Sequence, residues 1–133
     1  MSSEETPPAW AAWVAQAEHD VQVAGELRGM GYFDACLVYS EQAAEKMTKA
    51  LWMVRHGHAA PRTHAVGRLL AALEAPETVV SAGHRLTRRY FASRYPAMVS
   101  GPPCATTDAQ EADAALADAE EVIAWVRTLL PAA

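Results

Sequence analysis

A helical pattern over residues 32–55 is the feature that most constrains how this chain can fold. Apolar and small side chains recur there every three or four residues, the spacing of one face of an α-helix. The members of this stripe are Cys36, Leu37, Ser40, Ala43, Ala44, Met47, Ala50, Leu51 and Val54. The polar residues of the segment, which the pattern places on the opposite side in solvent, are Glu41, Gln42, Glu45, Lys46 and Lys49.

Four further segments show the same periodicity: 9–28, 64–73, 76–92 and 108–130. The apolar stripe of the first segment contains Trp10, Trp13, Val14, Ala17, Val21, Ala24 and Leu27. Thr63 is a suitable N-cap for the short third helix, and Asp108 with Glu111 begins the last helix with a capping box. Residues 93–107 are expected to form a loop. The pattern predicts an all-α, up-and-down bundle of four to five helices.

The length of 133 residues fits a single domain. We expect a disordered N-terminal tail over residues 1–8, a helical domain over 9–130 and a C-terminal tail over 131–133. No apolar run approaches the roughly 18 residues of a membrane span, and the acidic N-terminus lacks the apolar region of a signal peptide. Cys36 and Cys104 do not resemble a disulfide pair, so a cytoplasmic protein with no membrane partner is expected.

Charge is unevenly distributed along the chain, whose net charge is −5. Residues 55–94 contain seven of the nine arginines and only two acidic residues, whereas the flanking segments are strongly acidic. A basic patch would favour an anionic ligand such as a nucleotide, RNA or an acidic protein surface. The alternative is that these arginines are scattered over the surface.

Several motifs occur in a characteristic order along the chain. They are Tyr32-Phe33-Asp34-Ala35-Cys36-Leu37, Glu41-Gln42-Ala43-Ala44-Glu45-Lys46, Pro61-Arg62-Thr63-His64, Ser93-Arg94-Tyr95-Pro96 and Ala119-Glu120-Glu121-Val122-Ile123-Ala124-Trp125-Val126. Together they resemble the HEPN domain family of prokaryotic helical proteins, over nearly the whole chain from Trp13 to Leu130.

The resemblance implies a four- to five-helix bundle that forms a homodimer. It also implies a partner, because such domains are often paired with a minimal nucleotidyltransferase in arrangements resembling toxin–antitoxin modules. Many HEPN domains are metal-independent RNases that carry an Arg followed roughly four to six residues later by a His, where the His takes a proton and the Arg steadies the phosphate. No Arg of this chain has a His at that distance.

Two residues remain as candidate catalytic groups, His64 and Arg94, which would have to meet from different helices. His64 is predicted at a helix N-terminus, where backbone N–H groups favour anions, and Arg94 can bind phosphate through two nitrogens. The predicted ligand-binding set is Arg62, Thr63, His64, Arg94 and Tyr95. The structural alternatives are a capping or surface histidine, and an arginine that pairs with helix-end carbonyls or with a carboxylate such as Glu45.

Arg85, Arg88 and Arg89, next to Tyr90 and Phe91, mix charge with aromatic rings in a way that could bind nucleic acid. The simpler interpretation is a solvated arginine face beside core aromatics. The histidines at 56, 58 and 64 match no standard zinc spacing, and no metal or cofactor is expected.

Three hypotheses of function follow. The first is a regulatory module that binds a nucleotide or RNA without cutting it and acts with a minimal nucleotidyltransferase. The second is a metal-independent RNase toxin with a rearranged Arg/His site, and the third is a structural dimerisation bundle. The missing Arg–His spacing favours the first, non-enzymatic hypothesis.

Overall fold

The structure is a computed structural model that describes residues 6–94 and 101–132. Over these ranges it consists of helices and their connections, with no strand. The helices are α1 (Ala9–Gly29), α2 (Phe33–His56), α3 (Val66–Ala72), α4 (Glu77–Arg94), α5 (Pro103–Thr106) and α6 (Ala109–Arg127). The predicted all-α bundle is therefore confirmed, and its five predicted helices correspond to α1, α2, α3, α4 and α6.

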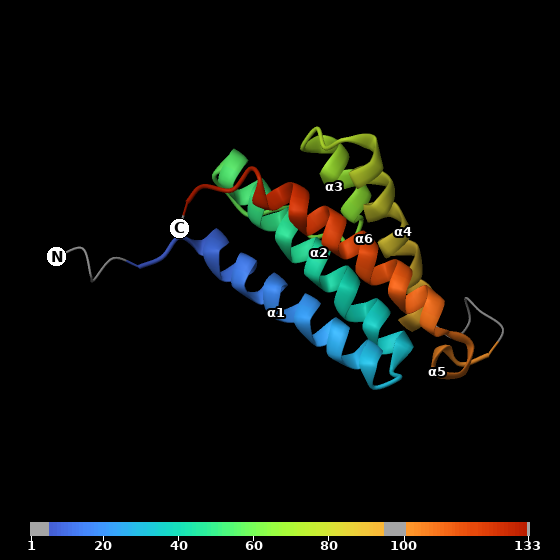
Figure 1. Ribbon diagram of the computed structural model, residues 1–133. Helices are drawn as coiled ribbons and strands as arrows, with labels where there is room; N and C mark the ends of the chain where they lie inside the picture. Colours follow the sequence, from blue (N-terminus) through green and yellow to red (C-terminus); the bar gives the residue numbers. More distant parts are fainter. Residues whose placement is uncertain (1–5, 95–100, 133) are drawn as a thin grey trace.

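Helix α2 is the central element of the bundle and contacts every other described helix. Figure 1 shows α1 and α2 as an antiparallel pair, with α6 lying along α2 and the short α3 beside α4. Gly31, with a φ of 86°, takes the left-handed conformation in the tight connection between α1 and α2. This central position explains why α2 is apolar on so much of its surface.

Two apolar clusters fill the interior. The larger one packs α2 against α3, α4 and α6 through residues such as Leu37, Leu70, Leu86 and Val122. The smaller one joins α1, α2 and α6, with Met47 and Leu51 at its centre. Cys36 is buried in the larger cluster and Cys104 is exposed, and neither forms a disulfide.

The prediction that the polar residues of α2 lie in solvent was wrong for Glu41, Glu45 and Lys49. All three are buried, with 0%, 6% and 8% of their surface exposed. The reason is that α2 is covered on more sides than the two-faced pattern implied. Trp13, placed in the apolar stripe of the first helix, is instead 38% exposed.

The helix ends agree with the sequence signals at the start of α6 and differ from them at the start of α3. The Asp108 side chain accepts a hydrogen bond from the Glu111 N–H at 2.9 Å, as the capping box requires. Thr63 does not cap α3 itself, because α3 begins only at Val66; its hydroxyl accepts a hydrogen bond from the Ala65 N–H at 3.0 Å. The expected loop over 93–107 contains the short helix α5, beginning at Pro103.

Among the described residues, none of the helices combines the length and the apolar character needed to cross a membrane.

Candidate functional site

The candidate site lies where the middle of α2, the connection leading into α3 and the second half of α4 meet. His64 is at the end of this connection, two residues before α3 begins. Its backbone carbonyl accepts a hydrogen bond from the Thr87 hydroxyl of α4 at 3.0 Å. The Thr63 hydroxyl accepts a hydrogen bond from the Ala65 N–H, which fixes the peptide group between His64 and Ala65. The backbone of His64 is thus anchored before its side chain makes any contact.

Glu45 of α2 orients the imidazole of His64. The Glu45 Oε1 atom lies 2.7 Å from His64 Nδ1, and Glu45 Oε2 accepts a hydrogen bond from Lys49 Nζ at 3.0 Å. An ionised carboxylate only accepts, so Nδ1 carries the proton and Nε2 is the ring nitrogen available to a ligand. The His64 side chain is 50% exposed whereas that of Glu45 is 8% exposed. A buried carboxylate therefore holds a half-exposed histidine in one orientation.

Glu41 lies one helical turn before Glu45 and is fully buried. Its Oε1 accepts a hydrogen bond from Gln42 Nε2 at 2.8 Å, whereas Oε2 finds no donor among the described residues. Burial and the neighbouring Glu45 carboxylate raise the pKa of Glu41 to about 9, so this group holds a proton at neutral pH.

The pKa of Glu45 moves in the opposite direction. Burial acts to raise it, but hydrogen bonds from Glu41, His64 and Lys49 outweigh that effect and leave the pKa below its ordinary value. Glu45 is therefore the charged member of the carboxyl pair at neutral pH.

Tyr90 of α4 contacts both His64 and Arg94. The ring centroids of His64 and Tyr90 are 5.2 Å apart, and the Arg94 guanidinium carbon lies 5.4 Å from the centroid of the Tyr90 ring. Arg94 also donates a hydrogen bond to the Tyr90 hydroxyl at 3.1 Å. His64 and Arg94, 30 residues apart in the sequence, thus contact a single buried aromatic ring.

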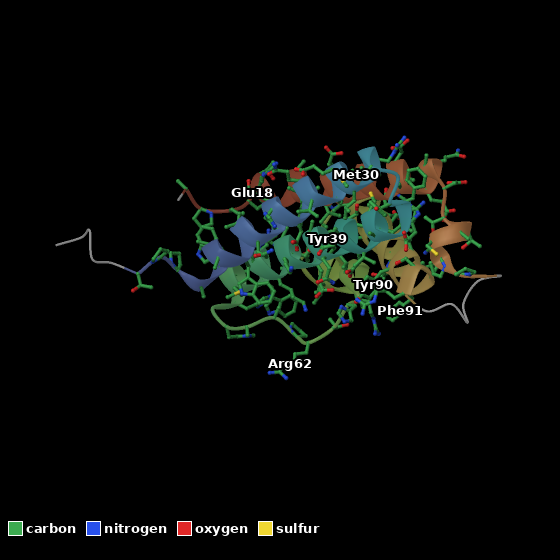
Figure 2. All side chains as sticks on the ribbon, turned by 90° about the horizontal axis from the view of Figure 1, so that it is seen from below. Glu18, Met30, Tyr39, Arg62, Tyr90 and Phe91 are labelled. Carbon is green, nitrogen blue, oxygen red and sulfur yellow. The ribbon has the colours of Figure 1, made fainter. Side chains whose placement is uncertain are left out.

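The remaining predicted ligand-binding residues fall into different places. Thr63 acts on the backbone, as described above. Arg62 is exposed, and Figure 2 shows its side chain extending away from the molecule on the connection before α3. Tyr95 lies outside the described residues. Of the predicted set, His64 and Arg94 each contact the ring of Tyr90.

The arginines of residues 55–94 do not act as one group. Arg85 and Arg89 both bind the Asp118 carboxylate of α6, at 2.9 Å each. Arg55 donates to the Leu73 carbonyl oxygen at 2.7 Å. Exposed arginines of this segment include Arg62, Arg88 and Arg94. The arginines at 85–89, which were expected to form a solvated face, are thus partly engaged in ion pairs with Asp118.

Sequence reasoning missed Glu41 and Tyr90 as parts of the site, and it offered Glu45 only as one possible partner of Arg94. Arg94 pairs with Tyr90, while Glu45 binds His64 and Lys49. One signal was available, because Glu41 and Glu45 are four residues apart on one helix and must share a face. Nothing in the sequence showed that this face is buried and that His64 contacts it.

The comparisons with known proteins agree with this architecture. The model of the HEPN domain matches residues 10–129. No curated protein matches the chain. A similar solved structure is TT1696 from Thermus thermophilus, with 31% sequence identity and a TM-score of 0.84, covering 91% of this chain and 98% of that one.

Two further solved structures are also similar. One is ST0689, described as an archaeal HEPN homologue, with 27% identity and a TM-score of 0.79 over 92% of this chain and 98% of that one. The other is a HEPN domain protein from Thermotoga maritima, TM0613, with 26% identity and a TM-score of 0.69 over 89% and 96% of the two chains. With a family model matching almost its entire length, the chain belongs to the HEPN domain family.

Proposed function

We propose that this HEPN protein binds a nucleotide or RNA through a phosphate group held between His64 and Arg94. The observation that carries the proposal is that both side chains lie against the ring of Tyr90 while remaining exposed themselves. Arg94 offers a planar fork of N–H donors suited to phosphate oxygens, and His64 offers a further donor or acceptor beside it. The Tyr90 ring is a contact that the two side chains share.

The surrounding charges are compatible with an anionic ligand. The negative charge of Glu45 is met by Lys49 and by the His64 ring, so it does not face an incoming anion unshielded. Phosphate contacts of this kind give an affinity that falls with increasing salt.

The biological role that we propose is that of a regulatory partner of a minimal nucleotidyltransferase in a toxin–antitoxin-like module, acting as a homodimer. This part rests on membership in the family. A neighbouring gene that encodes a small protein with a Gly-Ser motif and an Asp-x-Asp pair would support it.

A second candidate function is metal-independent RNA cleavage. The specific observation in its favour is the 2.7 Å contact between Glu45 and His64, because an oriented histidine can act as a general base toward a 2′-hydroxyl. Arg94 would then stabilise the charge that develops on the phosphate. The usual Arg–His sequence spacing is absent, so this site would be assembled from two elements.

Binding is tested with a fluorescently labelled single-stranded RNA and the purified protein in EDTA. We expect His64→Ala and Arg94→Ala each to weaken the affinity about tenfold, the effect of losing a charge-assisted hydrogen bond. The matched controls are His58→Ala and Arg127→Ala, since Arg127 pairs with Glu18 on a different part of the molecule. Unchanged affinity in both test variants would contradict the proposal.

The same samples decide between binding and cleavage. RNA that stays intact with concentrated wild-type protein argues against the RNase. Cleavage that disappears in both test variants and persists in both controls would establish it and overturn binding without cutting.

A further inference from the structure

We infer that Glu41, Glu45 and His64 form a binding site for a divalent transition metal, with Zn²⁺ as the ion that fits their chemistry best. One possible ligand atom from each of the three residues lies within 4.8 Å of the others. The three residues come from α2 and from the connection before α3. This inference concerns an ion and does not rest on RNA binding.

The first argument is the state of Glu41. A carboxyl group that is completely buried normally has all of its polar atoms satisfied. Here Oε1 is bound by Gln42, but Oε2 has no donor among the described residues when the group is ionised. A second carboxylate, that of Glu45, lies next to it. Two buried carboxyl groups this close need either a shared proton or a cation between them.

The second argument is the donor set. Glu41 and Glu45 occupy positions i and i+4 of one helix, so their side chains project from the same face and can bind one ion together. His64 adds an imidazole nitrogen from a separate element. Imidazole nitrogen and carboxylate oxygen are both ligands of Zn²⁺, whereas Mg²⁺ and Ca²⁺ prefer oxygen alone. Three protein ligands leave a fourth position for water or for a substrate.

The third argument is access and charge. Both carboxyl groups are buried, but the His64 side chain is half exposed, so an ion can enter from the His64 side. Lys49 binds Oε2 of Glu45, and His64 contacts Oε1. A bound ion would therefore be coordinated by Glu45 Oε1, which now contacts His64. Lys49 would keep its hydrogen bond to Oε2.

The test uses isothermal titration calorimetry of ZnCl₂ into full-length protein that has been freed of metal with EDTA. We expect one Zn²⁺ per chain, bound with micromolar or tighter affinity. Glu41→Gln and His64→Gln should each weaken binding by at least about 10- to 100-fold, because losing even a partner of a metal ligand costs that much. Glu41→Gln keeps the size of the side chain, and circular dichroism establishes that the variant is folded.

The control addresses the other histidines. The rings of His56 and His58 are 5.9 Å apart and exposed, so they could hold zinc at the surface. The double variant His56→Gln/His58→Gln should bind zinc like the wild type. The inference is overturned if the wild type binds no zinc, or if binding is lost in this control and retained in Glu41→Gln.

The two proposals can fail separately. Arg94 has no contact with Glu41 or Glu45 among the interactions described above. Arg94→Ala should therefore lose RNA binding in EDTA while still binding zinc like the wild type.

Discussion

At the scale of single residues, the buried charges of this bundle are organised in pairs and triads. Asp20 binds Lys46, Glu45 binds Lys49 and His64, and Asp118 binds two arginines. Several of these contacts join residues far apart in the sequence, such as Asp118 and Arg85. Removing a cation leaves the buried carboxylate without compensation, which costs more than the pair contributes.

Asp118→Ala should destabilise the protein by about 1–3 kcal/mol, because it strands the partly buried Arg85 and Arg89. Urea denaturation followed by circular dichroism measures this loss. The matched control is Asp113→Ala, which removes an exposed pair with Arg28 at the surface and should leave the unfolding midpoint nearly unchanged. Equal midpoints for the two variants would show that the Asp118 triad has no special role.

At the scale of elements, the close packing of α3 against α4 determines the position of the connection that contains His64. Gly83 of α4 packs directly on Gly67 of α3. A Cβ atom at position 83 would lie 2.9 Å from the Gly67 nitrogen and 2.8 Å from Leu70 Cδ1. A larger side chain here would push the two helices apart.

We therefore expect Gly83→Ala to destabilise the protein by about 1–3 kcal/mol. Gly25→Ala is the control, since a Cβ at this position of α1 meets nothing within 4 Å. That change should instead stabilise the helix by about 0.5–1 kcal/mol. Thermal unfolding of both variants measures whether their stability changes in opposite directions. A Gly83→Ala protein as stable as the wild type would contradict this packing of α3 on α4.

Most of the helices could be predicted from the sequence, because helix periodicity and helix caps depend on residues that are close in the sequence. The bounds of α1 and α2 follow from their apolar stripes, and the start of α6 follows from Asp108 and Glu111. The site could be predicted only in part. His64 and Arg94 were proposed as candidates from their chemistry. The burial of Glu41, Glu45 and Lys49 depends on how helices surround α2, which a one-dimensional pattern does not contain.

At the scale of the whole molecule, several large apolar side chains remain in solvent. Tyr39 and Phe91 are 38% and 36% exposed, and Phe91 packs edge-on against Tyr90 of the site, with ring centroids 5.6 Å apart. Figure 2 shows Phe91 beside Tyr90, and Met30 at the opposite edge of the molecule. Exposed aromatic groups next to a site are typical of interfaces.

If the proposed homodimer forms through Tyr39 and Phe91, the double variant Tyr39→Ser/Phe91→Ser should be a monomer. Sedimentation velocity at tens of micromolar measures the change. Met30→Ser removes a more exposed apolar side chain, 68% in solvent, and should leave the dimer intact. A wild-type monomer at this concentration would rule out the dimer, and a dimeric double variant would place the interface elsewhere.

The most direct test of the account is a double-mutant cycle on RNA affinity in EDTA with His64→Ala, Arg94→Ala and the combined variant. If both side chains hold the same phosphate, each single change weakens binding and the combined change weakens it by less than the two effects together, with a coupling of at least about 0.5 kcal/mol. Two single losses that add fully, or a single variant that binds like the wild type, would show that His64 and Arg94 do not form one site.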